Sequence, residues 1–310
     1  GDIQVGSQPS QTNLNEGLVI HYTFDQFNRG QQPSPRFPLI NNVEGLSNQS
    51  ASFTDGVHHP SSSIFVSSGS NAIANTGLFF SGSDRTAKLE NTEVEHGIQN
   101  TGNWSLSVFF KPTNVAREGD PPQQIFGAGG GSNGINLFIT SSKVISNFYE
   151  ETRGGVSSVT SASIDNNVMY HLVATYESGE AKLYLNSELI QTDNVHFGTL
   201  SGFSGDIKIG GATYTHEYYF TSGSTPTQFT STMTAYEGYL DEIRLYKDKV
   251  LTQNEVRAIF LNPQANISSI VNGGQITAGI IKSLNSSTTA GTILNLQPFI
   301  YVAPYQGLKL

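Results

Sequence analysis

Apolar and polar residues alternate along several short stretches of this chain with the period of two that is typical of β-strands. The clearest stretch is residues 103–112, where Trp104, Leu106, Val108 and Phe110 occupy every second position. Similar runs bounded by Gly, Ser, Asn or Pro predict strands at 17–25, 76–84, 124–129, 135–140, 143–149, 170–176, 181–186, 206–211 and 239–246. The pattern therefore predicts an all-β protein.

The last of these strands, residues 239–246, runs directly toward a predicted helix. Strict alternation places two sets of side chains on its opposite faces. One set is Tyr239, Asp241, Ile243 and Leu245, and the other is Leu240, Glu242, Arg244 and Tyr246. The adjacent carboxylates of Asp241 and Glu242 are therefore expected to face opposite ways.

A short amphipathic helix is predicted after this strand. Thr252 stands where an N-cap residue is expected, and Glu255 follows three positions later as its capping-box partner. Val256, Ile259 and Phe260 form one apolar face of the helix.

The composition also favours short strands joined by polar turns. Hydrophobic residues make up 36% of the 310 residues and charged residues 13%, while 18 phenylalanines and 13 tyrosines can fill a sandwich core. The net charge is −9 and no cluster of Lys or Arg occurs, so we expect no nucleic-acid binding. No apolar run is long enough for a membrane span, so no membrane insertion is expected, and the absence of cysteine excludes disulfides and thiol chemistry.

Five stretches follow one another in a recognisable order. They are Gly77-Leu-Phe-Phe-Ser-Gly82, Trp104-Ser-Leu-Ser-Val-Phe-Phe-Lys-Pro112, the hairpin 170–186, Asp206-Ile-Lys-Ile-Gly-Gly211 and Gly238-Tyr-Leu-Asp-Glu-Ile-Arg-Leu-Tyr246. Over residues 17–261, this order resembles the laminin-G-like jelly-roll domains of the concanavalin A-like lectin/glucanase superfamily. The resemblance implies a two-sheet antiparallel sandwich with one short helix after the last family strand.

Three parts of the chain are expected. Residues 1–16 are polar and are interpreted as an N-terminal arm, and residues 17–262 form the sandwich. Residues 263–310 form an added strand-rich tail, with predicted strands in 276–281 and 292–302. The tail is too apolar for a disordered terminus, so we expect it to dock on its own sandwich or on a neighbouring chain.

The resemblance also implies a metal site, because related domains often tie the first strand to the last with one structural calcium. The matching carboxylates are Asp25 and Asp241. The alternative is that Asp25 begins a turn and that Asp241 pairs with Arg244 or with a backbone amide.

Residues 212–236 are longer than the turn that the family places there, and they are rich in Tyr and Thr. Tyr214, Tyr218, Tyr219 and Tyr236 are the candidate ligand-binding residues, because such a segment can stack on sugar rings. The same segment could instead form two extended hairpin strands that grip another subunit, and this second interpretation is slightly favoured.

No catalytic residues are predicted. The paired-carboxylate pattern of the superfamily's β-glucanases and the Gly-x-Ser-x-Gly elbow of serine hydrolases are both missing. His21 and His171 fall inside strands, where hydrogen-bonded structural histidines are the expected outcome.

The sequence therefore predicts a non-catalytic extracellular, cell-surface or virion protein that binds neighbouring subunits, glycans or both, and that assembles as a homo-oligomer. Two alternatives remain open at this point. One is a carbohydrate-active enzyme with an unrecognised site, and the other is a calcium-dependent, glycan-binding adhesin.

Overall fold

The computed structural model describes the chain in segments. The described residues are 12–25, 39–43, 51–53, 64–73, 76–82, 87–89, 102–129, 133–150, 155–177, 179–194, 207–211, 214–222, 225–264, 267–268, 279–282 and 293–296. The chain divides into two compact units, one formed by Gln11–Ser268 and the other by Gly1–Ser10 with Ser269–Leu310.

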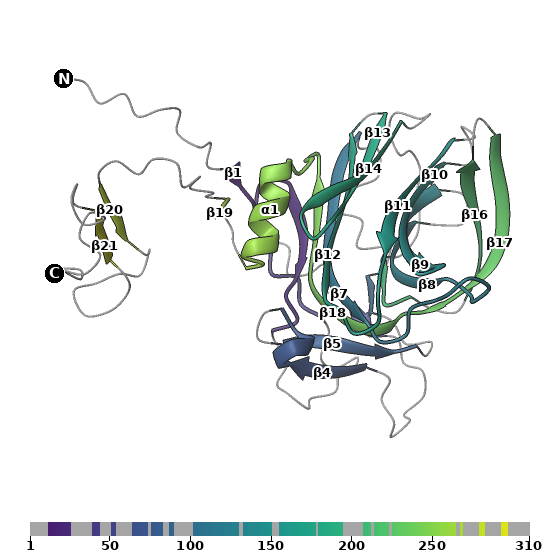
Figure 1. Cartoon of the computed structure of the whole chain (residues 1–310), viewed down its shortest axis with the longest axis horizontal. Coiled ribbons are helices and arrows are strands. Elements are labelled where there is room, and N and C mark those ends of the chain that lie inside the picture. Colours follow the sequence, from purple (N-terminus) through teal and green to yellow (C-terminus); the bar gives the residue numbers. More distant parts are fainter. Residues whose placement is uncertain are drawn as a thin grey trace. The chain divides into compact units, whose positions relative to one another are not determined.

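The larger unit contains an eight-stranded antiparallel sheet (Figure 1). Seven of its strands lie in the order β14-β13-β12-β7-β18-β5-β4, and β2 pairs with the far half of β18. Their bounds are β2 Leu18–Tyr22, β4 Ile64–Ser68, β5 Thr76–Ser81, β7 Asn103–Pro112, β12 Tyr170–Glu177, β13 Glu180–Leu185, β14 Glu188–Asn194 and β18 Glu237–Lys247.

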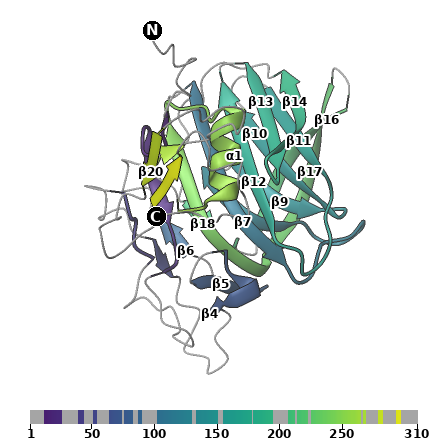
Figure 2. The same ribbon diagram turned by 60° about the vertical axis from the view of Figure 1, so that its left-hand side comes forward.

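A nine-stranded sheet packs against the first (Figure 2). Its main path is β11-β10-β9-β8-β15-β6-β3, and β17 adds to β8 in parallel while pairing with β16. The bounds are β3 Ser52–Phe53, β6 Ala87–Leu89, β8 Gln123–Gly129, β9 Asn133–Thr140, β10 Lys143–Glu150, β11 Gly155–Ser163, β15 Ile207–Ile209, β16 Tyr214–Ser222 and β17 Thr225–Ala235.

The main hydrophobic core lies between the two sheets. In β7, Trp104, Leu106, Val108 and Phe110 all belong to it, which confirms the alternation predicted for residues 103–112. Each fully buried large side chain contributes on the order of 2 kcal/mol of hydrophobic stabilisation. The predicted two-sheet jelly-roll sandwich is therefore confirmed.

The alternation predicted for residues 239–246 is wrong at one point, because β18 contains a β-bulge. Pairing with β7 shifts register between Asp241 and Arg244, and Glu242 adopts a φ of 48°. Leu240 therefore points into the core before the bulge, and Ile243 points into it after the bulge. An extra residue in one strand reverses the phase of every side chain that follows.

Helix α1 (Gln253–Leu261) begins at the predicted capping box. The Thr252 hydroxyl accepts a hydrogen bond from the Glu255 N–H, and the Glu255 carboxylate accepts one from the Thr252 N–H at 2.7 Å. Val256 and Ile259 are buried. Phe260 stacks on His171 of β12, so the helix covers the outer face of the eight-stranded sheet (Figure 1).

The long segment 212–236 contributes the antiparallel hairpin β16–β17. The hairpin belongs to the nine-stranded sheet through the pairing of β17 with β8, and β16 also contacts β10 and β11 of the same sheet (Figure 1). Phe138, Ile145 and Met233 form a small second hydrophobic cluster there. The hairpin shape is thus as predicted, while its binding to another subunit stays a prediction.

Two short strand pairs complete the described chain. Strand β1 (Thr12–Asn13) pairs with β19 (Ile267–Ser268), so these terminal residues belong to the sandwich unit. In the smaller unit, β20 (Gly279–Lys282) pairs with β21 (Ile293–Leu296), and the two strands overlap the two stretches predicted as strands. In the described part of the chain, no helix is long and apolar enough to span a membrane.

Candidate functional site

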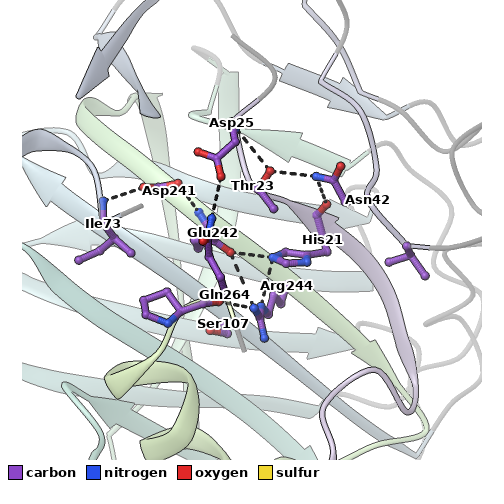
Figure 3. Close-up of polar contacts among 12 residues, drawn as sticks. His21, Thr23, Asp25, Asn42, Ile73, Ser107, Asp241, Glu242, Arg244 and Gln264 are labelled. Atoms are coloured by element: carbon purple, nitrogen blue, oxygen red, sulfur yellow. Dashed lines mark hydrogen bonds and ion pairs between the residues drawn. The ribbon is translucent and has the colours of Figure 1, made fainter. Parts of the chain in front are cut away.

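The β-bulge in β18 places a cluster of titratable side chains on the outer face of the eight-stranded sheet (Figure 3). Glu242 is fully buried, Arg244 is 1% exposed and His21, on the neighbouring strand β2, is 8% exposed. His21 and Arg244 are directly opposite each other in the register of β2 and β18. Three groups that normally contact water are therefore sealed together inside the protein.

Glu242 is the acceptor at the centre of this cluster. Its Oε2 lies 2.7 Å from His21 Nε2 and 3.8 Å from Arg244 Nη2. Arg244 Nε also lies 3.3 Å from the same His21 nitrogen. In the neutral ring Nε2 carries at most one proton. Because the contact with Glu242 is the shorter of the two, we place that proton between the two residues, and His21 Nε2 donates to Glu242 Oε2.

His21 is neutral in this arrangement. Burial lowers its pKa below the usual value, and this effect outweighs the hydrogen bond to Glu242, which acts in the opposite direction. The Glu242 carboxylate and the Arg244 guanidinium are then the oppositely charged pair at the centre of the cluster. Breaking such a buried pair costs far more than forming it contributes, because one charge is left uncompensated.

Arg244 also fixes the chain that follows helix α1. Its Nη2 donates to the carbonyl oxygen of Pro263, and Gln264 Nε2 donates to Asp25 Oδ2 at 2.7 Å (Figure 3). The cluster thus connects β2, β18 and the segment after the helix. This arrangement supports the stability of the fold, because the cluster joins β2 to β18 and to the segment after the helix, and these are distant from β2 in sequence.

The two predicted calcium ligands lie at one end of the cluster (Figure 3). Asp25 Oδ1 accepts a hydrogen bond from the Thr76 N–H at 3.1 Å. Asp241 is fully buried and accepts from the backbone N–H groups of Ile73 at 2.7 Å and Glu242 at 2.8 Å. Asp241 therefore makes the backbone contacts of the alternative interpretation.

The donor set around these aspartates is only partly that of a calcium site. Carboxylate oxygens are the ligands that calcium prefers. Within the described ranges, however, no group of three or more His, Cys, Asp or Glu side chains could hold a metal ion. Calcium at Asp25 and Asp241 stays a prediction.

A second buried histidine lies on the same outer face. His171 is stacked on Phe109 with 4.3 Å between ring centroids, and its Nε2 is 2.9 Å from Ser107 Oγ. Burial lowers its pKa to about 3, with a smaller contribution from the Arg244 charge. Both histidines therefore occupy the structural role that their strand positions predict.

The predicted ligand-binding tyrosines occupy two different settings. Tyr214, Tyr218 and Tyr219 lie in β16, where their backbones pair with residues 233, 229 and 228 of β17. Tyr236 belongs to the main core, and its hydroxyl donates to the Tyr239 carbonyl oxygen at 3.2 Å. Burial raises the pKa of Tyr236 well above its usual value. The structure therefore places Tyr236 away from the protein surface.

Sequence reasoning missed the cluster itself. His21 is more than 200 residues from Glu242 and Arg244 in the sequence, and the pairing of β2 with β18 brings the three residues together. The one available signal was the run Asp241-Glu-Ile-Arg244, which places three charged residues between the apolar residues Leu240 and Leu245.

The fold is a two-sheet jelly-roll β-sandwich. Residues 81–257 match the sequence pattern of a laminin-G family described as the concanavalin A-like lectin/glucanases superfamily. This match covers more than half of the chain, and the chain belongs to that superfamily. No curated protein sequence matches the chain.

Several solved structures share the fold. One is domain 4 of AbnA, a GH43 extracellular arabinanase from Geobacillus stearothermophilus, in complex with arabinotriose; it is 15% identical with a TM-score of 0.52, and the alignment covers 77% of this chain and 96% of that one. The receptor-binding domain of botulinum neurotoxin mosaic serotype C/D and the binding domain of serotype D are each 14% identical, with TM-scores of 0.51 over 80% of this chain. The chain spans about half the length of these toxin domains, at 51% of each.

Proposed function

We propose that this chain is a non-catalytic recognition protein that binds glycans outside the cell. The observation that carries the proposal is the likeness to the arabinanase domain that was solved with arabinotriose, because the alignment covers 96% of that domain. An extracellular setting for this chain agrees with that arabinanase being an extracellular enzyme.

The buried acidic residues support the non-catalytic part of the proposal. A retaining glycosidase needs two carboxylates about 5 Å apart that reach the same sugar. Asp241 and Glu242 have 0% exposed surface, so neither carboxylate can reach water or a substrate. Both accept hydrogen bonds from the protein itself. They therefore act within the fold.

Two assays on the full chain test the proposal. An array of immobilised arabinan, xylan, galactan, β-glucan, uronic-acid and sialylated oligosaccharides is expected to show binding, and incubation with the same glycans is expected to release no reducing ends. Absence of binding to every glycan would refute recognition. Turnover that disappears on substitution of one carboxylate would refute the non-catalytic assignment.

The same array tests the predicted tyrosines and the predicted calcium. A variant with Tyr214, Tyr218 and Tyr219 all changed to Ser should lose signal if β16 binds the glycan. Treatment with EDTA should lower the signal if Asp25 and Asp241 hold a calcium that orders the site, and unchanged binding in EDTA would count against calcium.

Binding of neighbouring copies is a second candidate function, favoured by the smaller unit. Strands β20 and β21 form a two-stranded sheet with the sequences Gly-Ile-Ile-Lys and Ile-Leu-Asn-Leu. Such a hairpin is marginally stable alone, because it has too little surface to bury. Light scattering on the full chain should show an oligomer that Ile280→Ser with Leu294→Ser dissociates; a monomer at high concentration would refute assembly.

A further inference from the structure

An aromatic row crosses the outer face of the eight-stranded sheet on the near side of the β-bulge. Phe79 of β5 and Lys111 of β7 are each directly opposite Tyr239 of β18 in the strand register. Their neighbours Leu78 and Leu240 point into the core, so the three side chains of the row point outward. All three are half-buried, which leaves part of each in contact with solvent.

The side chains of the row contact one another. The rings of Phe79 and Tyr239 are tilted by 46° with 4.9 Å between centroids, and Lys111 Nζ lies 5.9 Å from the Tyr239 centroid. Lys111 Nζ also donates to the Ser70 carbonyl oxygen at 3.1 Å and to Asn71 Oδ1 at 2.8 Å. An ammonium group has three N–H donors, so one remains for a ligand.

Lys111 has no carboxylate partner within ion-pair distance in the described part of the chain. Its charge is instead held by neutral oxygen atoms and by the face of Tyr239. A half-exposed cation placed this way can donate a hydrogen bond to a ligand without first breaking a salt bridge.

The surroundings of the row hold it in place. The Asp241 carboxylate accepts the Ile73 N–H at 2.7 Å, which fixes the segment after the 3₁₀ turn η1 (Gly69–Asn71). Gly238 lets β18 approach β7 closely, because a Cβ atom at this position, where φ is 153°, would lie 2.4 Å from the Lys111 carbonyl oxygen. A site whose parts are already ordered loses less entropy when a ligand binds.

We propose that Phe79, Tyr239, Lys111 and Asn71 form a binding site for one sugar ring of an oligosaccharide. A sugar ring has an apolar C–H face and a rim of hydroxyl groups. The aromatic row matches the face, while the remaining Lys111 N–H and the Asn71 side-chain amide match the rim. This inference rests on the proposed function and locates it on the opposite sheet from the β16–β17 hairpin.

Four variants on the same oligosaccharide array test the site. Tyr239→Ala should reduce binding at least tenfold, whereas Tyr239→Phe, which keeps the ring, should stay within threefold of the unchanged protein. Lys111→Gln should reduce binding threefold or more. Lys143→Gln is the matched control, because Lys143 is exposed on the other sheet and should leave binding unchanged. Thermal unfolding of each variant verifies that it is folded.

The outcomes separate this inference from the proposed function. If glycan binding survives Tyr239→Ala but is lost in the β16 tyrosine variant, the row is not the sugar-binding site, while the proposed function still holds. A change of oligomeric state in Tyr239→Ala without a change in glycan binding also refutes it, by identifying the row as an interface. No glycan binding by the unchanged protein refutes both. A loss of signal for uronic and sialylated glycans alone in Lys111→Gln would show that the ligand is an acidic sugar.

Discussion

Strand β18 carries two different outer surfaces, one on each side of its bulge. Before the bulge, Tyr239 lies beside Phe79 and Lys111, half open to solvent. After the bulge, Glu242 and Arg244 are sealed together with His21. The two halves share one strand and one sheet, yet one half presents polar groups to solvent and the other binds them entirely to the protein.

This contrast separates polar groups that stabilise the fold from polar groups that remain available for a ligand. Under helix α1 and the chain that follows it, a charge must find a protein partner, because water is excluded. At the open half, the Lys111 ammonium group retains solvent access and one uncommitted N–H. Substitutions in the sealed half are therefore expected to change stability, and substitutions in the open half to change binding.

The largest effect is expected from Glu242→Gln. This change removes the carboxylate that faces Arg244 in the buried cluster, which should lower the free energy of unfolding by about 3 kcal/mol. Urea denaturation measures the change, and Glu118→Gln at an exposed position is the control. A loss below about 1 kcal/mol would mean that the cluster contributes little to the fold.

The next effect is a pH dependence that His171 causes. Its folded pKa of about 3 lies below the unfolded value of 6.5, so the unfolded chain binds the proton first as the pH falls. The contribution of His171 is therefore fully present above pH 6.5 and is lost between pH 6.5 and 3, by about 2 kcal/mol at pH 5. His171→Gln should remove this part of the slope when denaturation curves at pH 7 and pH 5 are compared. Identical slopes would contradict a buried neutral His171.

A smaller effect should follow from loosening the helix that covers the sealed half. Thr252→Ala removes the hydroxyl that caps α1 and should cost about 1 kcal/mol of stability. Thr252→Ser keeps the hydroxyl and should recover most of this loss in thermal unfolding. Equal melting temperatures for the Ala variant and the unchanged protein would show that the cap is not needed.

The smallest effect on stability is expected in the open half. Lys111→Gln removes contacts to Ser70 and Asn71 at a half-exposed position and should change the unfolding free energy by only about 0.5 kcal/mol. The same urea measurement applies. A loss as large as that of Glu242→Gln would make Lys111 part of the structural framework and would erase the contrast between the two halves.

Local patterns in the sequence were sufficient for much of the fold. The alternation of Trp104, Leu106, Val108 and Phe110 identified one face of β7, and Thr252 with Glu255 identified the start of α1. These signals work because each depends on residues only two or three positions apart. The order of such stretches then indicated the superfamily to which the chain belongs.

The site depended on information that a strand does not contain by itself. Adjacent residues in a regular strand face opposite ways, so Asp241 and Glu242 were expected to be separated, and the bulge between Asp241 and Arg244 is set by pairing with β7. Likewise, Tyr236 resembled a surface aromatic in a Thr-rich segment, yet its ring lies in the core.

The amino-acid sequence alone determined that this chain forms a β-sandwich with a capped helix after its last family strand. The alternation of apolar and polar residues, the turn residues and the helix cap are all local properties of the sequence. Only the tertiary structure decided which of its charged and aromatic residues are sealed and which stay open. Burial and charge pairing arise between strands distant in sequence, as His21 and Glu242 show, and the bulge in β18 determines which side of the sheet the later residues of that strand face.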